Sequence, residues 1–443
     1  MTKRKGKTLP VTGDPSSLDP AVHRALAEAK RAAGDQLAAL AHLIAVQTLE
    51  AHAAGITKSD ELSGVATGYF MKGDYETSGR WYRLVIAIDP GCAIAFQNLA
   101  AIHDGKGEAA EAELYRQQAY RIQRVFVDQE ETASRRVLVL CAGRTSGNTP
   151  FTTLIPTAAS VRVKYALDYA AEDEDGRLPP YDLVFNAIGE PDAALEMAER
   201  LRHFEQGCRR PVLNPLAAIA RTQRHQLTEL LTGLEDVATT PCARFDQPAE
   251  TPDALAARLE AADLTFPLLA RPVSSHGGDG LARCDTLEEL EAAIHAFAGA
   301  YYLTGYADYR SADGFFRKYR MIFVDRQPFP YHQAISPDWM VHYFSADMER
   351  NPWKLEEEKR FLSDPEAALG ARAMDAVRAI GKRLDLDYGG IDFTLLPDGR
   401  VFVFEANATM LVHRERANGL LAHKNQPVQR IVEAFEAMLD SHR

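Results

Sequence analysis

The stretch from Tyr388 to Met410, YGGIDFTLLPDGRVFVFEANATM, constrains the fold more than any other part of the chain. It is typical of a β-hairpin, because the run IDFTLL meets a PDGR turn and a second apolar run, VFVF, follows at once. Side chains alternate along a strand, so Glu405 and Asn407 are expected on one face. Asp392 lies on the partner strand, at the level where the hairpin register would bring it across from Glu405. We therefore expect two carboxylates and an amide oxygen to converge at one end of a sheet.

Carboxylate and amide oxygens are hard ligands. Magnesium takes one or two carboxylates together with substrate phosphates and water, so this set predicts a magnesium site. The alternative is an exterior hairpin with ordinary acidic residues. A polar E-A-N sequence directly after four apolar β-formers is an unusual end for an exterior strand, which favours the metal site.

This hairpin resembles the metal-binding end of the ATP-grasp superfamily, whose pattern is an apolar strand with Asp, a turn, an apolar strand and then Glu-x-Asn. Within the superfamily the chain is most similar to the D-alanine–D-alanine ligase branch, over residues 135–443. The resemblance implies ATP and two Mg²⁺ ions as cofactors. Asp392 and Glu405 would be metal ligands, with Glu405 bridging both ions and Asn407 completing the second site.

Length and charge narrow the class of protein. A chain of 443 residues is expected to hold two to four domains, and 46% apolar with 25% charged residues is ordinary for a globular protein. The formal net charge of −12 argues against a nucleic-acid partner. No apolar run is long enough for a membrane span, and five scattered cysteines without a CxxC pair indicate a reducing, cytoplasmic location. Residues 1–18 are basic without an apolar core and are predicted to be a disordered leader.

Residues 19–129 have apolar positions at helical spacing and contain an internal repeat. The turn pairs Gly73-Asp74 and Gly107-Glu108 lie 34 residues apart, and an earlier unit turns at Gly34-Asp35. This period resembles tetratricopeptide repeats, which present a groove to a peptide or protein partner. The alternative is a plain helical module that pairs two copies into a homodimer.

Residues 135–247 alternate strands and helices, which predicts a small parallel α/β domain. The strand in RRVLVLCAGR lacks the G-x-G-x-x-G spacing, so a dinucleotide site is rejected. The segment resembles the pre-ATP-grasp domain, which implies a basic phosphate contact on its helix at Arg224, with Arg221 as second choice. A solvated helix face is the alternative for either arginine.

Residues 248–443 are expected to form the ATP-grasp domain, as two α+β lobes with ATP between them. The strand TFPLLAR runs into a glycine loop whose backbone amides could hold phosphate oxygens, and Arg271 at the strand end adds a fixed charge. The family usually has lysine at this position. The loop candidates for phosphate binding are Ser274, Ser275, His276, Gly277, Gly278 and Gly280.

By the same resemblance Tyr302, Leu303 and Thr304 are the hinge that binds adenine. The family often has an acidic residue for the ribose at the start of the next strand. Here that strand reads FRKYRMIF and has Lys318 and Arg320 instead. Either the ribose contact has moved, for example to Asp308, or these cations face phosphate or the substrate carboxylate.

The candidates for catalysis lie on three segments. His342 belongs to WMVHYFSADM, where relatives have a mobile loop over the reaction centre; an aromatic packing segment is the alternative. Arg414 and Arg416 follow the hairpin and are expected beside the γ-phosphate. Many relatives have an arginine two residues before the metal aspartate, where this chain has Gly390, so Arg414, Arg416 or Arg320 is expected to replace it.

The function implied is an ADP-forming carboxylate–amine ligase that makes an amide or peptide bond through an acyl phosphate. Its substrates would be small molecules or peptides, and the helical repeats could hold a peptide or protein acceptor. The alternative is a non-catalytic or regulatory ATP-binding protein in which the helical repeats serve as an interaction scaffold. Intact Asp392, Glu405 and Asn407 argue against that alternative.

Overall fold

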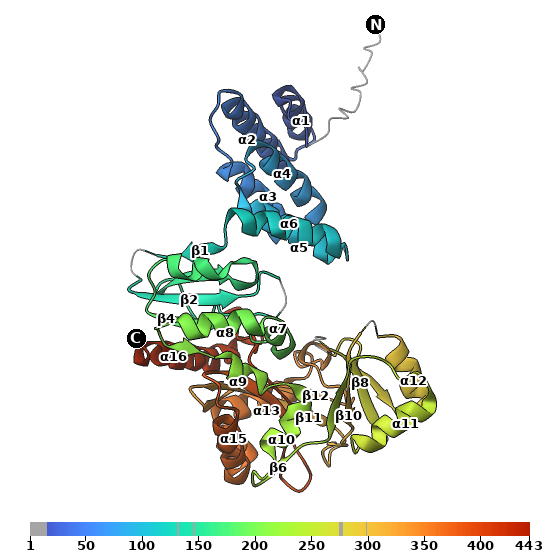
Figure 1. The fold of residues 1–443 in the computed structure, drawn as a ribbon. Coiled ribbons are helices and arrows are strands. Elements are labelled where there is room, and N and C mark those ends of the chain that lie inside the picture. Colours follow the sequence, from blue (N-terminus) through green and yellow to red (C-terminus); the bar gives the residue numbers. More distant parts are fainter. Residues whose placement is uncertain (1–15, 131–132, 145–146, 274–277, 298) are drawn as a thin grey trace. The chain divides into compact units, whose positions relative to one another are not determined.

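The computed structural model describes residues 16–130, 133–144, 147–273, 278–297 and 299–443 (Figure 1). The predicted leader therefore lies almost wholly outside the described residues. The chain divides into two compact units. The first comprises residues 1–124 and 143–145, and the second comprises residues 125–142 and 146–443.

The first unit is built of helices joined in pairs by glycine turns. Its helices in the described residues are α1 (Pro20–Ala32), α2 (Gln36–Ala53), α3 (Asp60–Met71), α4 (Tyr75–Ile88), α5 (Ala93–Gly105) and α6 (Ala109–Ile122). Gly34, Gly73 and Gly107 have φ angles of 82°, 78° and 77° at the turns within the three pairs, a conformation that glycine adopts without strain. The predicted helix–glycine–helix pattern is thus present. The finer tetratricopeptide arrangement stays a prediction.

The second unit begins with an α/β domain around a five-stranded sheet of order β1-β3-β2-β4-β5. The strands are β1 (Val125–Asp128), β2 (Arg135–Cys141), β3 (Ser160–Ala166), β4 (Leu183–Asn186) and β5 (Val212–Leu213). The strands β3, β2, β4 and β5 are parallel, as the alternating pattern predicts, and β1 is an antiparallel edge. The domain starts earlier than predicted, because β1 lies inside the range expected to be helical.

Helices cover both faces of this sheet. The helices α7 (Pro191–Glu196), α8 (Ala198–Gly207) and α9 (Leu216–Ala220) pack on one face, against Leu138 and Leu140. The C-terminal helix α16 (Asn425–Ser441) packs on the other, against Val137 and Val139. Alternating strand residues therefore face different layers, and the end of the chain completes the core of its first α/β domain.

The first lobe after this domain is a four-stranded sheet of order β7-β10-β8-β9. Its strands are β7 (Cys242–Phe245), β8 (Leu268–Pro272), β9 (Ala282–Cys284) and β10 (Tyr301–Gly305). The helices α11 (Pro252–Ala261) and α12 (Leu287–His295) pack on one side of it (Figure 1).

The second lobe is a five-stranded sheet of order β12-β11-β13-β14-β6. Its strands are β6 (Val237–Ala238), β11 (Phe316–Val324), β12 (Gln327–Ser336), β13 (Tyr388–Leu395) and β14 (Val401–Asn407). Around it lie α10 (Arg224–Leu231), α13 (Pro352–Ser363), α14 (Pro365–Leu369) and α15 (Ala371–Leu384). The strands β6 and β7 precede residue 248, so the lobes begin earlier than the predicted boundary.

The second unit also contains short 3₁₀ turns, namely η1 (Leu167–Tyr169), η2 (Glu172–Arg177), η3 (Tyr343–Ser345) and η4 (Ala422–Lys424).

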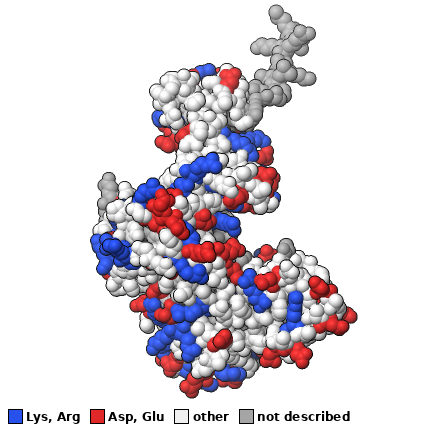
Figure 2. Space-filling model, viewed as in Figure 1, with Lys and Arg blue, Asp and Glu red and all other residues white. Residues whose placement is uncertain are grey.

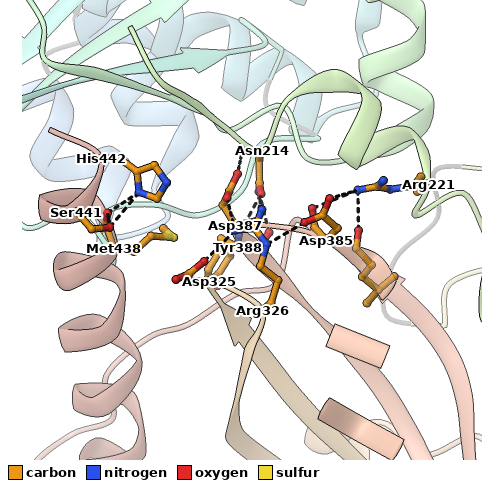
Figure 3. Close-up of polar contacts among 11 residues, drawn as sticks. Asn214, Arg221, Asp325, Arg326, Asp385, Asp387, Tyr388, Met438, Ser441 and His442 are labelled. Atoms are coloured by element: carbon orange, nitrogen blue, oxygen red, sulfur yellow. Dashed lines mark hydrogen bonds and ion pairs between the residues drawn. The ribbon is translucent and has the colours of Figure 1, made fainter. Parts of the chain in front are cut away.

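Asn214, which follows β5, fastens the α/β domain to the start of β13 (Figure 3). Its amide oxygen accepts hydrogen bonds from the backbone N–H groups of Asp387 and Tyr388, at 2.9 and 3.0 Å, and its Nδ2 donates to the Tyr388 carbonyl at 2.7 Å. Asn214 is fully buried and has a φ of 53°, which asparagine tolerates better than most residues. Arg326 pairs with Asp387 at 2.7 Å. The strand that carries Asp392 is therefore held at its first residue.

Among the helices in the described part of the chain, none combines the length and the apolar character needed to cross a bilayer. Figure 2 shows basic and acidic side chains mixed over the face of the molecule that it draws.

Candidate active site

Three charged side chains form a row across neighbouring strands of the second lobe. In the register of the sheet, Asp392 on β13 is the partner of Arg320 on β11 and of Glu405 on β14. Residues paired across strands share a face, so all three side chains point to the same side of the sheet. The expected level of Asp392 and Glu405 in the hairpin is confirmed. The register shifts directly after Asp392, where Phe393 pairs with Val403 and Phe404 is the extra residue of a bulge.

The row is held by ion pairs. Arg320 binds Asp392 with a fork, Nε to Oδ1 at 2.6 Å and Nη2 to Oδ2 at 2.9 Å. Lys318, two residues earlier on β11, lies 3.3 Å from the same carboxylate. At the other end of the row, Arg224 from α10 pairs with Glu405. Each carboxylate is therefore neutralised by a cation from a different element.

These cations keep both acids ionised. Burial would raise the pKa of Asp392, but Arg320 and Lys318 outweigh it and hold that pKa well below its usual range. Burial likewise opposes ionisation of Glu405, and Arg224 is the main charge that lowers its pKa. Both side chains are thus anionic acceptors at neutral pH.

The row lies in the wall of a cavity of about 550 Å³ between the two lobes. Its lining contains four cations, Arg224, Arg271, Lys318 and Arg320, against the two carboxylates. The surplus of positive charge suits a polyanion such as a nucleotide triphosphate. The lining also contains apolar side chains, among them Leu269, Leu281, Met340, Val403 and Phe404. One cavity therefore offers apolar surface as well as the cluster of cations around Asp392 and Glu405, which we call its cationic end.

The donor set at the cationic end fits magnesium. Asp392, Glu405 and Asn407 supply hard oxygens, and Asn407 Oδ1 already accepts hydrogen bonds from the backbone N–H and the hydroxyl of Thr409, both at 2.5 Å. Across the described residues, no cluster of three or more His, Cys, Asp and Glu side chains offers a site made of protein ligands alone. Ligands from a phosphate chain would have to complete the coordination.

Of the three residues predicted to bind adenine, only Thr304 lines the cavity. Tyr302 and Leu303 do not line the cavity, because β10 is an inner strand whose backbone pairs with β7 and β8, and both side chains are buried. Thr304 does line it, together with Gly305, Tyr306 and Ala307. Tyr302 instead donates a hydrogen bond to Asp192 of α7, at 3.1 Å. The backbone becomes available to a ligand only where the strand pairing ends.

Two predicted catalytic arginines lie outside the site. Arg414 is exposed and bonds to Gln429 of α16, and Arg416 is exposed as well; neither lines the cavity. Position 390 cannot hold an arginine either, because a Cβ there would lie 2.6 Å from the Met321 carbonyl oxygen. Of the three expected replacements, only Arg320 lines the cavity.

The other predicted residues fall into three groups. Arg224, Arg271, Gly278, Lys318 and His342 line the cavity. Gly280 does not, but it has a φ of 67°, and a Cβ there would lie 2.9 Å from the Pro272 ring, which explains why glycine is needed. Arg221 bonds to Asp385 and to the Leu384 carbonyl, away from the cavity (Figure 3), and Asp308 does not line it. Ser274, Ser275, His276 and Gly277 lie outside the described residues.

Two histidines that the charge of Arg320 affects, His342 in the first cavity and His332 in the second, are neutral at neutral pH. Burial, followed by the charges of Lys318 and Arg320, lowers the pKa of His342. His332, on β12, is buried, and its pKa is well below its usual value because of burial and Arg320. Neutral imidazoles can accept a hydrogen bond beside the cations without adding charge.

A second cavity, of about 570 Å³, is also lined by Arg320, and the sequence alone does not indicate it. Its other lining residues include Tyr331, Tyr343, Glu415 and Lys424. They come from β12, from η3, from the segment after the hairpin and from η4, so no local pattern joins them. His413, a further residue of the post-hairpin segment, lines it as well.

Comparisons with known proteins give structural likeness only. No family model and no curated protein matches the sequence. The chain aligns with the D-Ala:D-Ser ligase VanG from Enterococcus faecalis, at 14% identity, over 68% of this chain and 99% of that one, with a TM-score of 0.41. It also aligns with the D-alanine–D-alanine ligase from Bacillus anthracis complexed with ATP, at 13% identity, over 70% and 100%, with a TM-score of 0.41. A third similar structure is the ATP-grasp ligase PsnB, at 12% identity, over 69% and 99%, with a TM-score of 0.38. At such values the function has to be inferred from the residues of this chain.

Proposed function

We propose that this chain is an ATP-dependent ligase of the ATP-grasp kind, which joins a carboxylate to an amine through an acyl phosphate and releases ADP. The observation that carries the proposal is the cationic end of the first cavity. There Asp392, Glu405 and Asn407 lie beside Arg224, Arg271, Lys318 and Arg320. The apolar side chains of the same lining have the character expected of a site for a nucleotide base.

Each part of the cavity has a role in this proposal. The segment Thr304–Ala307 would meet adenine, and Arg271 and Lys318 would bind phosphate oxygens. Asp392, Glu405 and Asn407 would hold two Mg²⁺ ions, which supply charge neutralisation at the triphosphate. Arg224 fixes the orientation of Glu405, and Arg320 fixes that of Asp392.

The chemistry proposed has two balanced steps. A carboxylate oxygen of the first substrate attacks the γ-phosphorus of ATP, which forms an acyl phosphate and releases ADP. An amine then attacks the acyl carbon, the C–O bond to phosphate breaks, and inorganic phosphate leaves as the amine loses a proton. The protein contributes mainly by positioning and by compensating the negative charge of the phosphoryl group. Arg320 is the side chain best placed for this, since it lines both cavities.

A screen of carboxylic acids paired with amines tests the proposal. ADP release should depend on Mg²⁺ and should rise when an acid and an amine are present together, and mass spectrometry should detect the amide. ATP binding without any acid-dependent ADP release across the screen would favour the regulatory alternative.

The helical unit is proposed to bind a peptide or protein acceptor. Several of its large apolar side chains are exposed, among them Leu37, Met71 and Leu114 at 69%, 79% and 64%. The unit has a hydrophobic core of its own, so the rest of the chain can be tested from Val125 onward. Such a chain should bind ATP normally but have a raised KM for the true acceptor. Unchanged kcat/KM in a monomer, where the intact chain is a dimer, would make the helices an assembly module instead.

A further inference from the structure

The second cavity differs from the first in its charge. Arg320, Phe344 and Leu411 line both cavities, so the two spaces meet at Arg320. The lining of the second holds as many acidic as basic side chains: Arg320, Arg350, Lys424, Asp347, Glu349 and Glu415. Balanced charge of this kind suits a molecule that carries groups of both signs rather than a polyphosphate.

Lys424 is the most deeply buried charge in this lining. Its side chain is 3% exposed, against 19% for Arg320 and 20% for Glu415. The ammonium lies 4.2 Å from the ring centre of Tyr343 and 5.3 Å from that of Tyr331. Two aromatic faces therefore hold it at the wall of the cavity.

Two carboxylates act on this ammonium without a short contact. Oε1 of Glu415 lies 3.7 Å from Nζ and also contacts His413 Nε2 at 3.1 Å. The buried Glu358 attracts Lys424 more strongly, but its carboxylate accepts a hydrogen bond from Tyr343 at 3.0 Å and contacts His423 at 2.9 Å. Burial outweighs both carboxylates and lowers the pKa of Lys424. A ligand carboxylate within hydrogen-bond distance would therefore stabilise the charged form of this side chain.

We propose that the second cavity binds the amine substrate of the ligation and that Lys424 holds a free carboxylate of that substrate. This inference rests on the proposed function. The substrate class is an amino acid with an apolar or aromatic side chain, for which Tyr331, Leu420 and Leu421 offer packing surface. With its carboxylate at Lys424, the molecule presents its amino group toward Arg320, where the two cavities meet.

Calorimetric titration of the full chain tests the site without turnover. With Mg²⁺ and a non-hydrolysable ATP analogue present, phenylalanine, leucine, methionine and tyrosine are compared with their α-carboxamides. At least one acid should bind about 10- to 100-fold more tightly than its amide, the effect of one charge-assisted hydrogen bond. Lys424→Met should abolish this preference, and Lys424→Arg should keep part of it. Lys359→Met, which removes an exposed lysine outside both cavities, should behave like the wild type.

A second variant covers the case in which Lys424→Met fails to fold. Glu415→Gln removes the carboxylate that pairs with Lys424, so the preference for the acid over the amide should increase. A preference equal to that of the wild type in this variant would mean that Lys424 does not bind the substrate carboxylate. Equal affinity of acids and amides in the wild type, or no binding of any of the four, would overturn the inference.

The proposed function and this inference can fail separately. In one outcome, amino-acid binding depends on Lys424 and on the carboxylate while the screen of acids and amines gives no ADP release. That result would contradict the proposed ligase activity but support the carboxylate site at Lys424. If the enzyme ligates amino-acid amides as well as amino acids, and Lys424→Met does not change this, the ligase activity is supported and the carboxylate site at Lys424 is contradicted.

Discussion

Arg320 and Asp392 lie directly opposite each other on β11 and β13, and the guanidinium of Arg320 contacts both oxygens of the carboxylate, at 2.6 and 2.9 Å. The Asp392 side chain is only 3% exposed. Both residues line the first cavity and Arg320 also lines the second, and Arg320 is the main charge that keeps the buried Asp392 ionised.

Breaking this pair should destabilise the second unit. Arg320→Met leaves a buried carboxylate with Lys318 as its remaining cation, and we expect a loss of about 3 kcal/mol in the free energy of unfolding. Denaturant unfolding measures this. Arg378→Met, which removes an arginine that pairs with Glu366 and Asp375 at the surface, is the matched control and should cost less than about 1 kcal/mol. Equal losses in the two variants would mean that the pair at Asp392 is solvated.

The metal ligands should control turnover. Glu405→Gln removes a charge between the proposed cations, and we expect ATP turnover to fall by a factor of ~10² or more. Steady-state ADP release at saturating Mg²⁺ measures the effect, and Glu356→Gln, at an exposed position, is the control. Magnesium-dependent turnover that persists in both Glu405→Gln and Asp392→Asn would rule out the assigned metal site.

Replacing an arginine inside the cavity should weaken the binding of an ATP analogue, and replacing one outside the cavity should not. Arg271→Met should weaken the binding of an ATP analogue sharply, and Arg271→Lys only in part, because lysine keeps the charge but not the fork. Arg414→Met should leave the affinity unchanged, because that side chain is exposed and bonds to Gln429. Calorimetric titration measures the affinity of each of the three variants for the ATP analogue. Equal affinities for wild type and Arg271→Met would exclude a phosphate contact at Arg271.

The helical unit should lose stability in mild acid. His42 on α2 and His23 on α1 are buried with their Nδ1 atoms 3.0 Å apart, and burial, then His23 and Lys30, lower the pKa of His42 to about 4. The unfolded chain has an ordinary histidine pKa of about 6.5 and binds the proton more readily. Stability is therefore complete above about pH 6.5 and declines as the pH falls toward 4.

Fluorescence of Trp81, whose ring centre lies 5.0 Å from that of His42, reports this unfolding when Trp339 and Trp353 are replaced by phenylalanine. His42→Asn keeps a hydrogen-bonding group near the Nδ1 position but cannot titrate, so it should flatten the pH dependence. An equally steep loss of stability between pH 6.5 and 4 in that variant would assign the effect to other groups.

The sequence predicts the site best where the candidate metal ligands and the strand pattern that positions them lie in one segment. The hairpin and its polar ending occupy one continuous stretch, so the register of Asp392 and Glu405 could be predicted from strand periodicity alone. Arg224, which is predicted to contact phosphate, lines the cavity, and its pairing with Glu405 has no signal in the sequence.

The rest depends on contacts between distant segments. Tyr302 lies on an inner strand, which only the pairing of β10 with β7 and β8 reveals. Arg414 bonds to α16, a helix whose place on the first α/β sheet no local pattern indicates. Lys424 enters the second cavity from a short turn, far in sequence from Arg320. Such positions follow from tertiary packing rather than from periodicity.

The central claim is that a substrate carboxylate is activated by phosphoryl transfer from ATP, and oxygen-18 labelling tests it most directly. For any acid and amine that give ADP release, the acid is supplied with ¹⁸O in its carboxylate and the inorganic phosphate is analysed by mass spectrometry. The acyl phosphate route predicts one ¹⁸O atom in the phosphate, because the carboxylate oxygen that attacks phosphorus leaves with it. The same reaction is run in parallel with unlabelled acid in H₂¹⁸O. Inorganic phosphate that contains ¹⁸O from the water, and none from the labelled acid, would contradict the account.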